Sequence, residues 1–253
     1  MNLEGKYISV RNTRFPDKPN EDYCLCDNAN GIYILLDGVT RDKIQGKYPN
    51  PSPALCVSEL FAFSTHEFLK KALVNYSKDI LSTIRDAMKH GNSCIASYNN
   101  KDKYTFMPGT VGIVLWVRDN VAYSGFIGDC FGRIVSSNNS ILFTRCQTEY
   151  VHKREYTTHE IRNVICNNVK HPAGYGVLNG QENALDFIEL GEHRIAKADK
   201  ILLYTDGFEK AINTLTTNQL YDLTINDAKE LSQSQNDENA DDKTIVIISY
   251  KGC

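Results

Sequence analysis

The sequence lacks the features of a secreted, membrane or nucleic-acid-binding protein. Its first residues, MNLEGKYISV, are largely polar, and no run approaches the roughly 18 apolar residues that a membrane span needs. The formal net charge is only -3 and acidic and basic residues are interspersed, so no basic surface for nucleic acid or anionic lipid is indicated. We therefore expect a cytoplasmic protein with no nucleic-acid partner and no membrane partner.

The sequence has 8 cysteines but no cysteine framework. They are scattered, and the one close pair, Cys24 and Cys26, has no second pair at the spacing of a zinc site. Neither a disulfide scaffold nor a structural zinc site is indicated, which is typical of reduced thiols in a cytosol. Because free cysteine packs well in protein interiors, we expect most of these side chains to be small buried hydrophobes.

Motifs for covalent catalysis are also missing. The sequence has no Gly-x-Ser-x-Gly segment, no cysteine followed by a phosphate-cradling loop with arginine, and no phosphate-loop lysine. A phosphoaspartyl enzyme of the haloacid dehalogenase type is a weak alternative, because it needs Asp-x-Asp and the residues two positions either side of Asp37 are Leu35 and Val39. Hydrolysis without a protein nucleophile is favoured.

The 253 residues have an ordinary globular composition, 42% apolar and 23% charged, and we expect a single domain over 1–253. Helical spacing of apolar residues predicts two long amphipathic helices over 54–74 and 77–98. Short runs rich in Val, Ile and aromatics predict an antiparallel meander over 109–145. Residues 146–183 are polar and aperiodic, which predicts a flap or an irregular connection.

The other predicted strands are buried β-rich runs, and acidic residues flank them. These acidic residues are Glu21, Asp22, Asp37, Asp206, Asp241 and Asp242. A single Asp-Gly pair, such as Asp37-Gly38, more often marks a turn. Several carboxylates at strand ends instead indicate a site for hard cations such as Mg²⁺ or Mn²⁺, which take oxygen ligands. Two such ions roughly 4 Å apart can activate a water that attacks a phosphoryl group.

Six segments occur in one order along nearly the whole chain: NEDYC (20–24), ILLDGV (34–39), GTVGIVLWV (109–117), GFIGD (125–129), ILLYTDGF (201–208) and DDKTIVIISY (241–250). Together they resemble the type 2C metal-dependent Ser/Thr protein phosphatases, the PPM family, in its compact bacterial branch. The resemblance implies an α+β fold, a four-layer α-β-β-α sandwich in which two antiparallel sheets are flanked by helix pairs.

The resemblance also implies roles for individual residues. Asp37 would bridge two Mn²⁺ or Mg²⁺ ions, and Asp206 with Asp241 would complete one of them, which makes these three aspartates catalytic. Glu21 and the backbone carbonyl of Gly38 would bind the other ion.

Two further aspartates have implied roles beside the ions. Asp22 would hold water next to them without binding an ion itself. Asp129 matches a position that, with the equivalent of Asp206, holds a third and weaker ion in relatives; the alternative is that Asp129 is a turn residue.

The sequence departs from the family pattern at the phosphate-binding position. Relatives have an arginine four residues before Glu21, where this chain has Asp17. Arg14 or Lys18 could replace it, and we favour Arg14 because its guanidinium can hold phosphate through two hydrogen bonds. Val39 also stands where animal and plant relatives have a histidine that protonates the leaving group.

We expect metal-dependent hydrolysis of phosphoserine and phosphothreonine by a monomer, with the phosphoprotein product of a Ser/Thr kinase as the signalling substrate. Two alternatives stay open. The missing arginine and histidine favour a catalytically weak or dead regulatory module, and the metal chemistry alone would also suit a phosphatase of small phosphoesters. Residues 146–183 are predicted to shape the substrate entrance.

Overall fold

Two five-stranded antiparallel sheets form the centre of the protein. The computed structural model describes residues 3–15, 17–39, 43, 46–74, 79–99, 107–234 and 241–250. The first sheet has the spatial order β1 (Leu3–Val10), β10 (Lys243–Tyr250), β9 (Lys200–Tyr204), β6 (Phe131–Ser136) and β7 (Asn139–Leu142). The second has the order β2 (Tyr23–Asp27), β3 (Ile32–Gly38), β4 (Thr110–Arg118), β5 (Val121–Ile127) and β8 (Glu189–Arg194).

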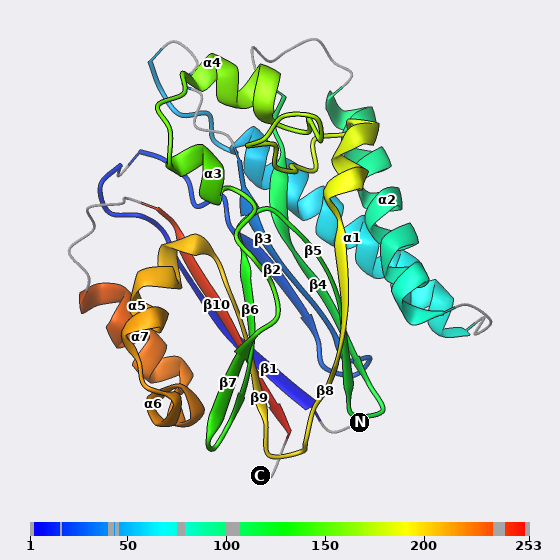
Figure 1. Ribbon diagram of the computed structural model, residues 1–253, viewed down its shortest axis with the longest axis vertical. Coiled ribbons are helices and arrows are strands. Elements are labelled where there is room, and N and C mark those ends of the chain that lie inside the picture. The colour runs from blue at the N-terminus through cyan, green and yellow to red at the C-terminus, as the bar shows by residue number, and fades with distance from the viewer. Residues whose placement is uncertain are drawn as a thin grey trace.

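Helices cover the outer faces of both sheets (Figure 1). The second sheet is covered by α1 (Pro53–Val74) and α2 (Ile80–Asn99), which confirms the two predicted long helices. The first sheet is covered by three short helices, α5 (Glu209–Thr214), α6 (Thr217–Asp222) and α7 (Ile225–Ser234). The predicted α+β class and four-layer architecture are therefore confirmed.

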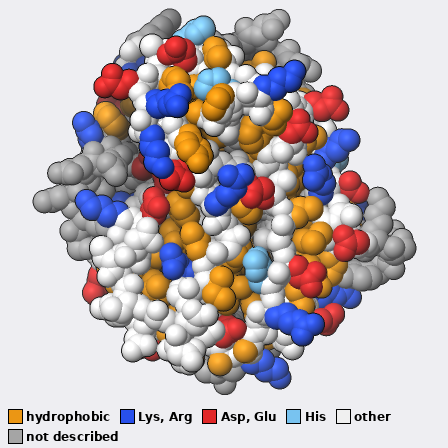
Figure 2. Space-filling model, in the orientation of Figure 1, with side chains coloured by type: hydrophobic (Ala, Val, Ile, Leu, Met, Phe, Trp, Pro, Cys, Tyr) orange, Lys and Arg blue, Asp and Glu red, His pale blue; other side chains and the backbone are white. Residues whose placement is uncertain are grey.

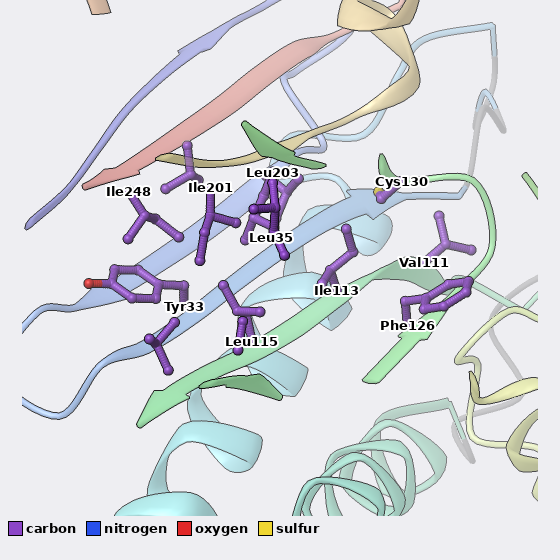
Figure 3. Packing of buried hydrophobic residues seen from close by; sticks show 14 of the residues in the cluster. Tyr33, Leu35, Val111, Ile113, Leu115, Phe126, Cys130, Ile201, Leu203 and Ile248 are labelled. Atoms are coloured by element: carbon purple, nitrogen blue, oxygen red, sulfur yellow. The ribbon is translucent and has the colours of Figure 1, made fainter. Parts of the chain in front are cut away.

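Three apolar layers hold these four layers together. Figure 3 shows the central layer, in which Leu35 and Ile113 of the second sheet meet Leu203 of the first. Along β3, Tyr33 and Leu35 belong to this layer, whereas Ile32, Ile34 and Leu36 pack under α1 and α2. Both faces of β3 are thus buried, which explains its continuous apolar run.

The alternation along β3 also determines where its last acidic residue lies. Successive side chains of a strand point to opposite faces. Asp37 therefore follows Tyr33 and Leu35 onto the face that looks toward the first sheet, at the end of the central apolar layer. The strand delivers a carboxylate into the space between the sheets.

The predicted meander over 109–145 is divided between the two sheets. β4 and β5 belong to the second sheet, and β6 and β7 belong to the first. The chain crosses at Gly128, whose φ is +88° and where an added Cβ would lie 2.3 Å from the Cβ of Val111. The strand pattern does not reveal this crossing because strands of both sheets have similar apolar sequences.

Residues 146–183 contain α3 (Glu149–His152), α4 (Thr158–Glu160) and the π-helical turn η1 (Ile161–Ile165). Val151, Ile165, Tyr175 and Val177 from this segment are buried in the central apolar layer. The predicted irregular connection is therefore a packed segment, and its anchors are long-range contacts that sequence periodicity does not report. The short 3-10 helix η2 (Glu182–Phe187) follows it and leads to β8.

The surface and the cysteines agree with the composition in part. Figure 2 shows Lys and Arg side chains interspersed with Asp and Glu over the face drawn. Among the described helices, none is long and apolar enough to cross a membrane. The seven described cysteines are free, but only Cys130 is buried and the others are half-buried. The expectation of buried cysteines is wrong for most of them.

We expect Gly128→Ala to destabilise the protein by about 2 kcal/mol or more, because alanine would be strained at this φ and its Cβ would collide with Val111. Gly46→Ala is the matched control: its φ is +80° but nothing lies within 4 Å of the added Cβ, so only strain of about 1 kcal/mol is expected. Urea unfolding would measure both losses of stability, provided that the denaturant dependence of the unfolding free energy (the m-value) is the same in each protein. Equal losses would show that the contact with Val111 is unimportant.

Candidate functional site

Carboxylates from both sheets converge at one end of the space between them. Burial raises the pKa of Asp37 well above its ordinary value, and the charges of Asp22, Asp206, Asp241 and Asp129 raise it further. These neighbours come from four separate parts of the chain. The two ends of the chain are marked at the opposite end of the sandwich in Figure 1.

Three of these carboxylates lie in loops next to inner strands of the sheets. Asp206 begins the 3-10 helix η3 (Asp206–Phe208) just after β9, and Asp241 directly precedes Asp242 and β10. Asp129 lies in the crossing from β5 to β6. Because β9 and β10 are adjacent and antiparallel, the end of one and the start of the other must meet.

Threonines fix the geometry of these strand ends. Thr205 is fully buried; its hydroxyl donates to Oδ2 of Asp22 over 3.0 Å and accepts from the backbone N–H of Thr244 over 3.0 Å. Thr110 donates to the backbone carbonyl of Asp37 over 2.9 Å. Ser58 of α1 in turn donates to Thr110 over 3.0 Å. Hydroxyl groups therefore tie both sheets and α1 to the acidic cluster.

The glycines of the two Asp-Gly pairs permit close contacts between backbones. An added Cβ at Gly38 would lie 2.8 Å from the backbone oxygen of Glu21, and one at Gly207 would lie 2.1 Å from the backbone oxygen of Asp242. Each contact brings one acidic loop against another. The pairs thus mark convergence of the strand ends as well as local turns.

The structure places Lys18 inside the acidic cluster. Its side chain is buried, and its Nζ lies 2.9 Å from Oδ2 of Asp242 and 3.1 Å from Oε2 of Glu21. Burial opposes the charged form, but the two carboxylates outweigh burial and raise the pKa of Lys18. The ammonium group stays charged among the predicted metal ligands.

Both carboxylate oxygens of Asp242 accept hydrogen bonds from the protein. Its Oδ1 accepts from the backbone N–H and the side-chain amide of Asn12 over 2.8 and 3.0 Å. Its Oδ2 accepts from Lys18 and from the backbone N–H of Glu21 over 2.9 and 3.0 Å. Of the acidic pair Asp241–Asp242, the charge of Asp241 is the one that acts on Asp37. The sequence offered no signal for Asn12, and the three-residue spacing of Lys18 and Glu21 was the only hint of their contact.

The other predicted residues lie at or near this end. Asp129 accepts a hydrogen bond from Thr148 over 2.9 Å, so the segment 146–183 begins at the acidic cluster. Its far end is joined to β4 by two backbone hydrogen bonds between Leu178 and Thr110. Arg14 is exposed, and its guanidinium carbon lies 5.6 Å from the centre of the Phe15 ring.

The donor set fits a hard divalent cation. It consists of buried or half-buried carboxylate oxygens that repel one another, and a cation would relieve that repulsion. Within the described ranges, however, no group of three or more His, Cys, Asp or Glu side chains is already arranged to hold an ion. The carboxylates would have to move toward a cation to bind it.

No family model and no curated protein matches the chain in sequence. Solved bacterial phosphatases nevertheless match its structure. The Mycobacterium tuberculosis serine/threonine phosphatase PstP has 18% identity and a TM-score of 0.70, with 99% of each chain covered. PppA, a type VI secretion regulator of Pseudomonas aeruginosa, has 16% identity and a TM-score of 0.70, with 99% of this chain and 98% of PppA covered.

Two further matches agree with these. The S. agalactiae serine/threonine phosphatase has 18% identity and a TM-score of 0.65, with 98% of this chain and all of that chain covered. A structure of the PstP catalytic domain that contains two manganese ions has 18% identity and a TM-score of 0.68, with 98% and 97% covered. At these identities the likeness establishes the fold, which is that of PPM-type Ser/Thr phosphatases.

The acidic cluster predicts a pH effect on stability in metal-free protein. Burial and the charge of Asp242 raise the pKa of Asp22 from 3.8 to about 7. Between these values the folded protein binds more protons at Asp22 than the unfolded chain does, so the free energy of unfolding falls as pH rises and levels off above pH 7. We expect Asp22→Asn, which keeps an acceptor for Thr205, to lose this dependence.

Urea unfolding in EDTA at pH 4.5 to 7.5 would measure the difference. The stability of Asp22→Asn relative to the unsubstituted protein should rise with pH, by about 3 kcal/mol between pH 4.5 and pH 7.5. A difference that does not change with pH would contradict the assignment.

Proposed function

We propose that this protein hydrolyses phosphoserine and phosphothreonine in proteins with the help of two divalent cations, Mn²⁺ or Mg²⁺. The observation that carries the proposal is the convergence of Asp37 with Asp22, Asp206, Asp241 and Asp129 between the sheets. The phosphatase fold supports it. The proposed substrate is a phosphoprotein made by a Ser/Thr kinase. The proposed active form is a monomer.

The proposed metal ligands follow the positions of the carboxylates. Asp37, on the face between the sheets, would bridge the ions, and Asp206 and Asp241 would complete one of them. Glu21 and the carbonyl of Gly38, whose backbones are in contact, would bind the other. When bound, such ions lower the pKa of a shared water and offset the charge on the phosphoryl group.

The remaining residues would position substrate and water. Asp22, whose carboxylate is held by Thr205, would orient water beside the ions, and Asp129 would support a third ion. Arg14 would bind the phosphate: it is exposed, whereas Lys18 of the same loop is buried against two carboxylates. Arginine can make two parallel hydrogen bonds to a phosphate.

A catalytically weak regulatory module is the second candidate. Lys18 favours it, because a buried ammonium next to Glu21 and Asp242 already neutralises part of the charge that would attract cations. A phosphatase of small phosphoesters would use the same carboxylates. Comparing a phosphothreonine peptide with p-nitrophenyl phosphate, each with Mn²⁺, Mg²⁺ and EDTA, separates the three functions.

We expect Asp37→Asn to lower metal-dependent turnover by more than about 100-fold, because it removes the charge that both ions would share. Asp119→Asn is the matched control, since Asp119 is an exposed aspartate in the β4–β5 turn with a side chain 90% accessible. Circular dichroism and urea unfolding would check the fold of both. Retained activity in Asp37→Asn, or no turnover by the unsubstituted protein with any metal, would refute the proposal.

The segment 146–183 is proposed to contact the polypeptide part of the substrate. Tyr150 is exposed on α3, two residues beyond the Thr148 that binds Asp129. We expect Tyr150→Ala to lower kcat/KM for a phosphopeptide by about 5- to 10-fold, the loss of one aromatic contact, and to leave hydrolysis of p-nitrophenyl phosphate unchanged. Tyr7→Ala, on the exposed face of β1, is the control. Equal effects on both substrates would argue against a peptide contact.

A further inference from the structure

We propose that Lys18 is an internal counter-ion that weakens cation binding on the Glu21 side of the site, so that the protein binds its two divalent ions with unequal affinity. This inference rests on the proposed function, and it concerns how the two halves of the site differ. Lys18 is a positioning residue here, because its role is to set the charge around Glu21.

The ion pairs of Lys18 are buried and are held in place by neighbouring groups. Its ammonium lies 2.9 Å from Asp242 and 3.1 Å from Glu21, and the side chains of all three residues are at most 4% exposed. Asp242 is held by Asn12 and by the backbone of Glu21 at the same time. A lysine fixed this way cannot leave without leaving buried carboxylate charge unpaired, which is costly.

The second oxygen of Glu21 also has a partner. Oε1 accepts a hydrogen bond from the hydroxyl of Ser52, and Ser52 lies just before α1, where its hydroxyl accepts from the backbone N–H of Ala54 over 3.2 Å. The amino end of a helix carries partial positive charge. Glu21 is therefore compensated by an ammonium group on one oxygen and by a hydroxyl at a helix start on the other.

Asp37 has the opposite surroundings. The charges of Asp22, Asp206, Asp241 and Asp129 all act against its ionisation. A cation at Asp37 relieves this repulsion. A cation at Glu21 instead approaches a fixed positive charge and competes with Lys18 for the same oxygen, so it gains less. The first ion should therefore bind between the aspartates, and the second should bind weakly.

Calorimetric titration of the metal-free protein with Mn²⁺ tests the proposal. We expect one tight ion and a second ion at least about 10-fold weaker, a difference of about 1.4 kcal/mol. Lys18→Met removes the charge and keeps an apolar stem, and should tighten the second ion by about 10-fold or more while leaving the first within about 2-fold.

Lys70→Met is the matched control. Lys70 pairs with Glu67 at the same three-residue separation, over 3.2 Å, but on the exposed surface of α1. It changes the net charge by the same amount, so an unchanged second ion in this variant shows that the effect is local. Lys18→Gln, which retains a donor for Asp242, replaces Lys18→Met if the latter does not fold.

The outcomes separate the inference from the proposed function. Glu21→Gln should lose the weak ion and keep the tight one. The inference would be overturned if the unsubstituted protein bound two ions with equal affinity. It would also be overturned if the second ion bound equally or more weakly after Lys18 is neutralised. Either result would still be compatible with a two-metal phosphatase. Absence of Mn²⁺ binding in every variant would refute both.

Discussion

Repulsion among buried carboxylates is the constraint on which the rest of this structure depends. Like charges placed close together in a poorly solvated site oppose their own ionisation, and the charges of four other aspartates act on Asp37. Such a cluster persists only where a well-packed scaffold holds it. The three apolar layers, the hydroxyl ties of Thr205 and Thr110, and the close backbone contacts at Gly38 and Gly207 supply that scaffold.

Strand geometry in the sandwich determines where these carboxylates lie. β3 is buried on both faces, so the direction of its last side chain is decided by the same alternation that packs Tyr33 and Leu35 between the sheets. β9 and β10 are neighbours in the other sheet, and their acidic ends face β3 across the apolar layer. The site is thus assembled from both sheets, and its geometry depends on how the sheets pack together.

Lys18 changes the balance of charge within the acidic cluster. Asp17 is exposed, whereas the neighbouring Lys18 is buried against Glu21 and Asp242. A positive charge therefore lies inside the acidic cluster. In the proposed function, substrate would contact the exposed Arg14 and the packed segment 146–183, whose start is bound to Asp129 through Thr148.

Local signals in the sequence were sufficient to predict several elements. The run over 31–37 with its terminal aspartate, the two long helices, and the acidic residues at strand ends could all be predicted, because periodicity and turn chemistry act over a few residues. Long-range contacts instead determine the crossing between the sheets at Gly128, the packing of 146–183 and the partner of Lys18. Lys18 and Asp242 are 224 residues apart, and Asp241 and Asp242 are adjacent in sequence. Which of the pair binds Lys18 depends on tertiary packing, and no short window of sequence contains that information.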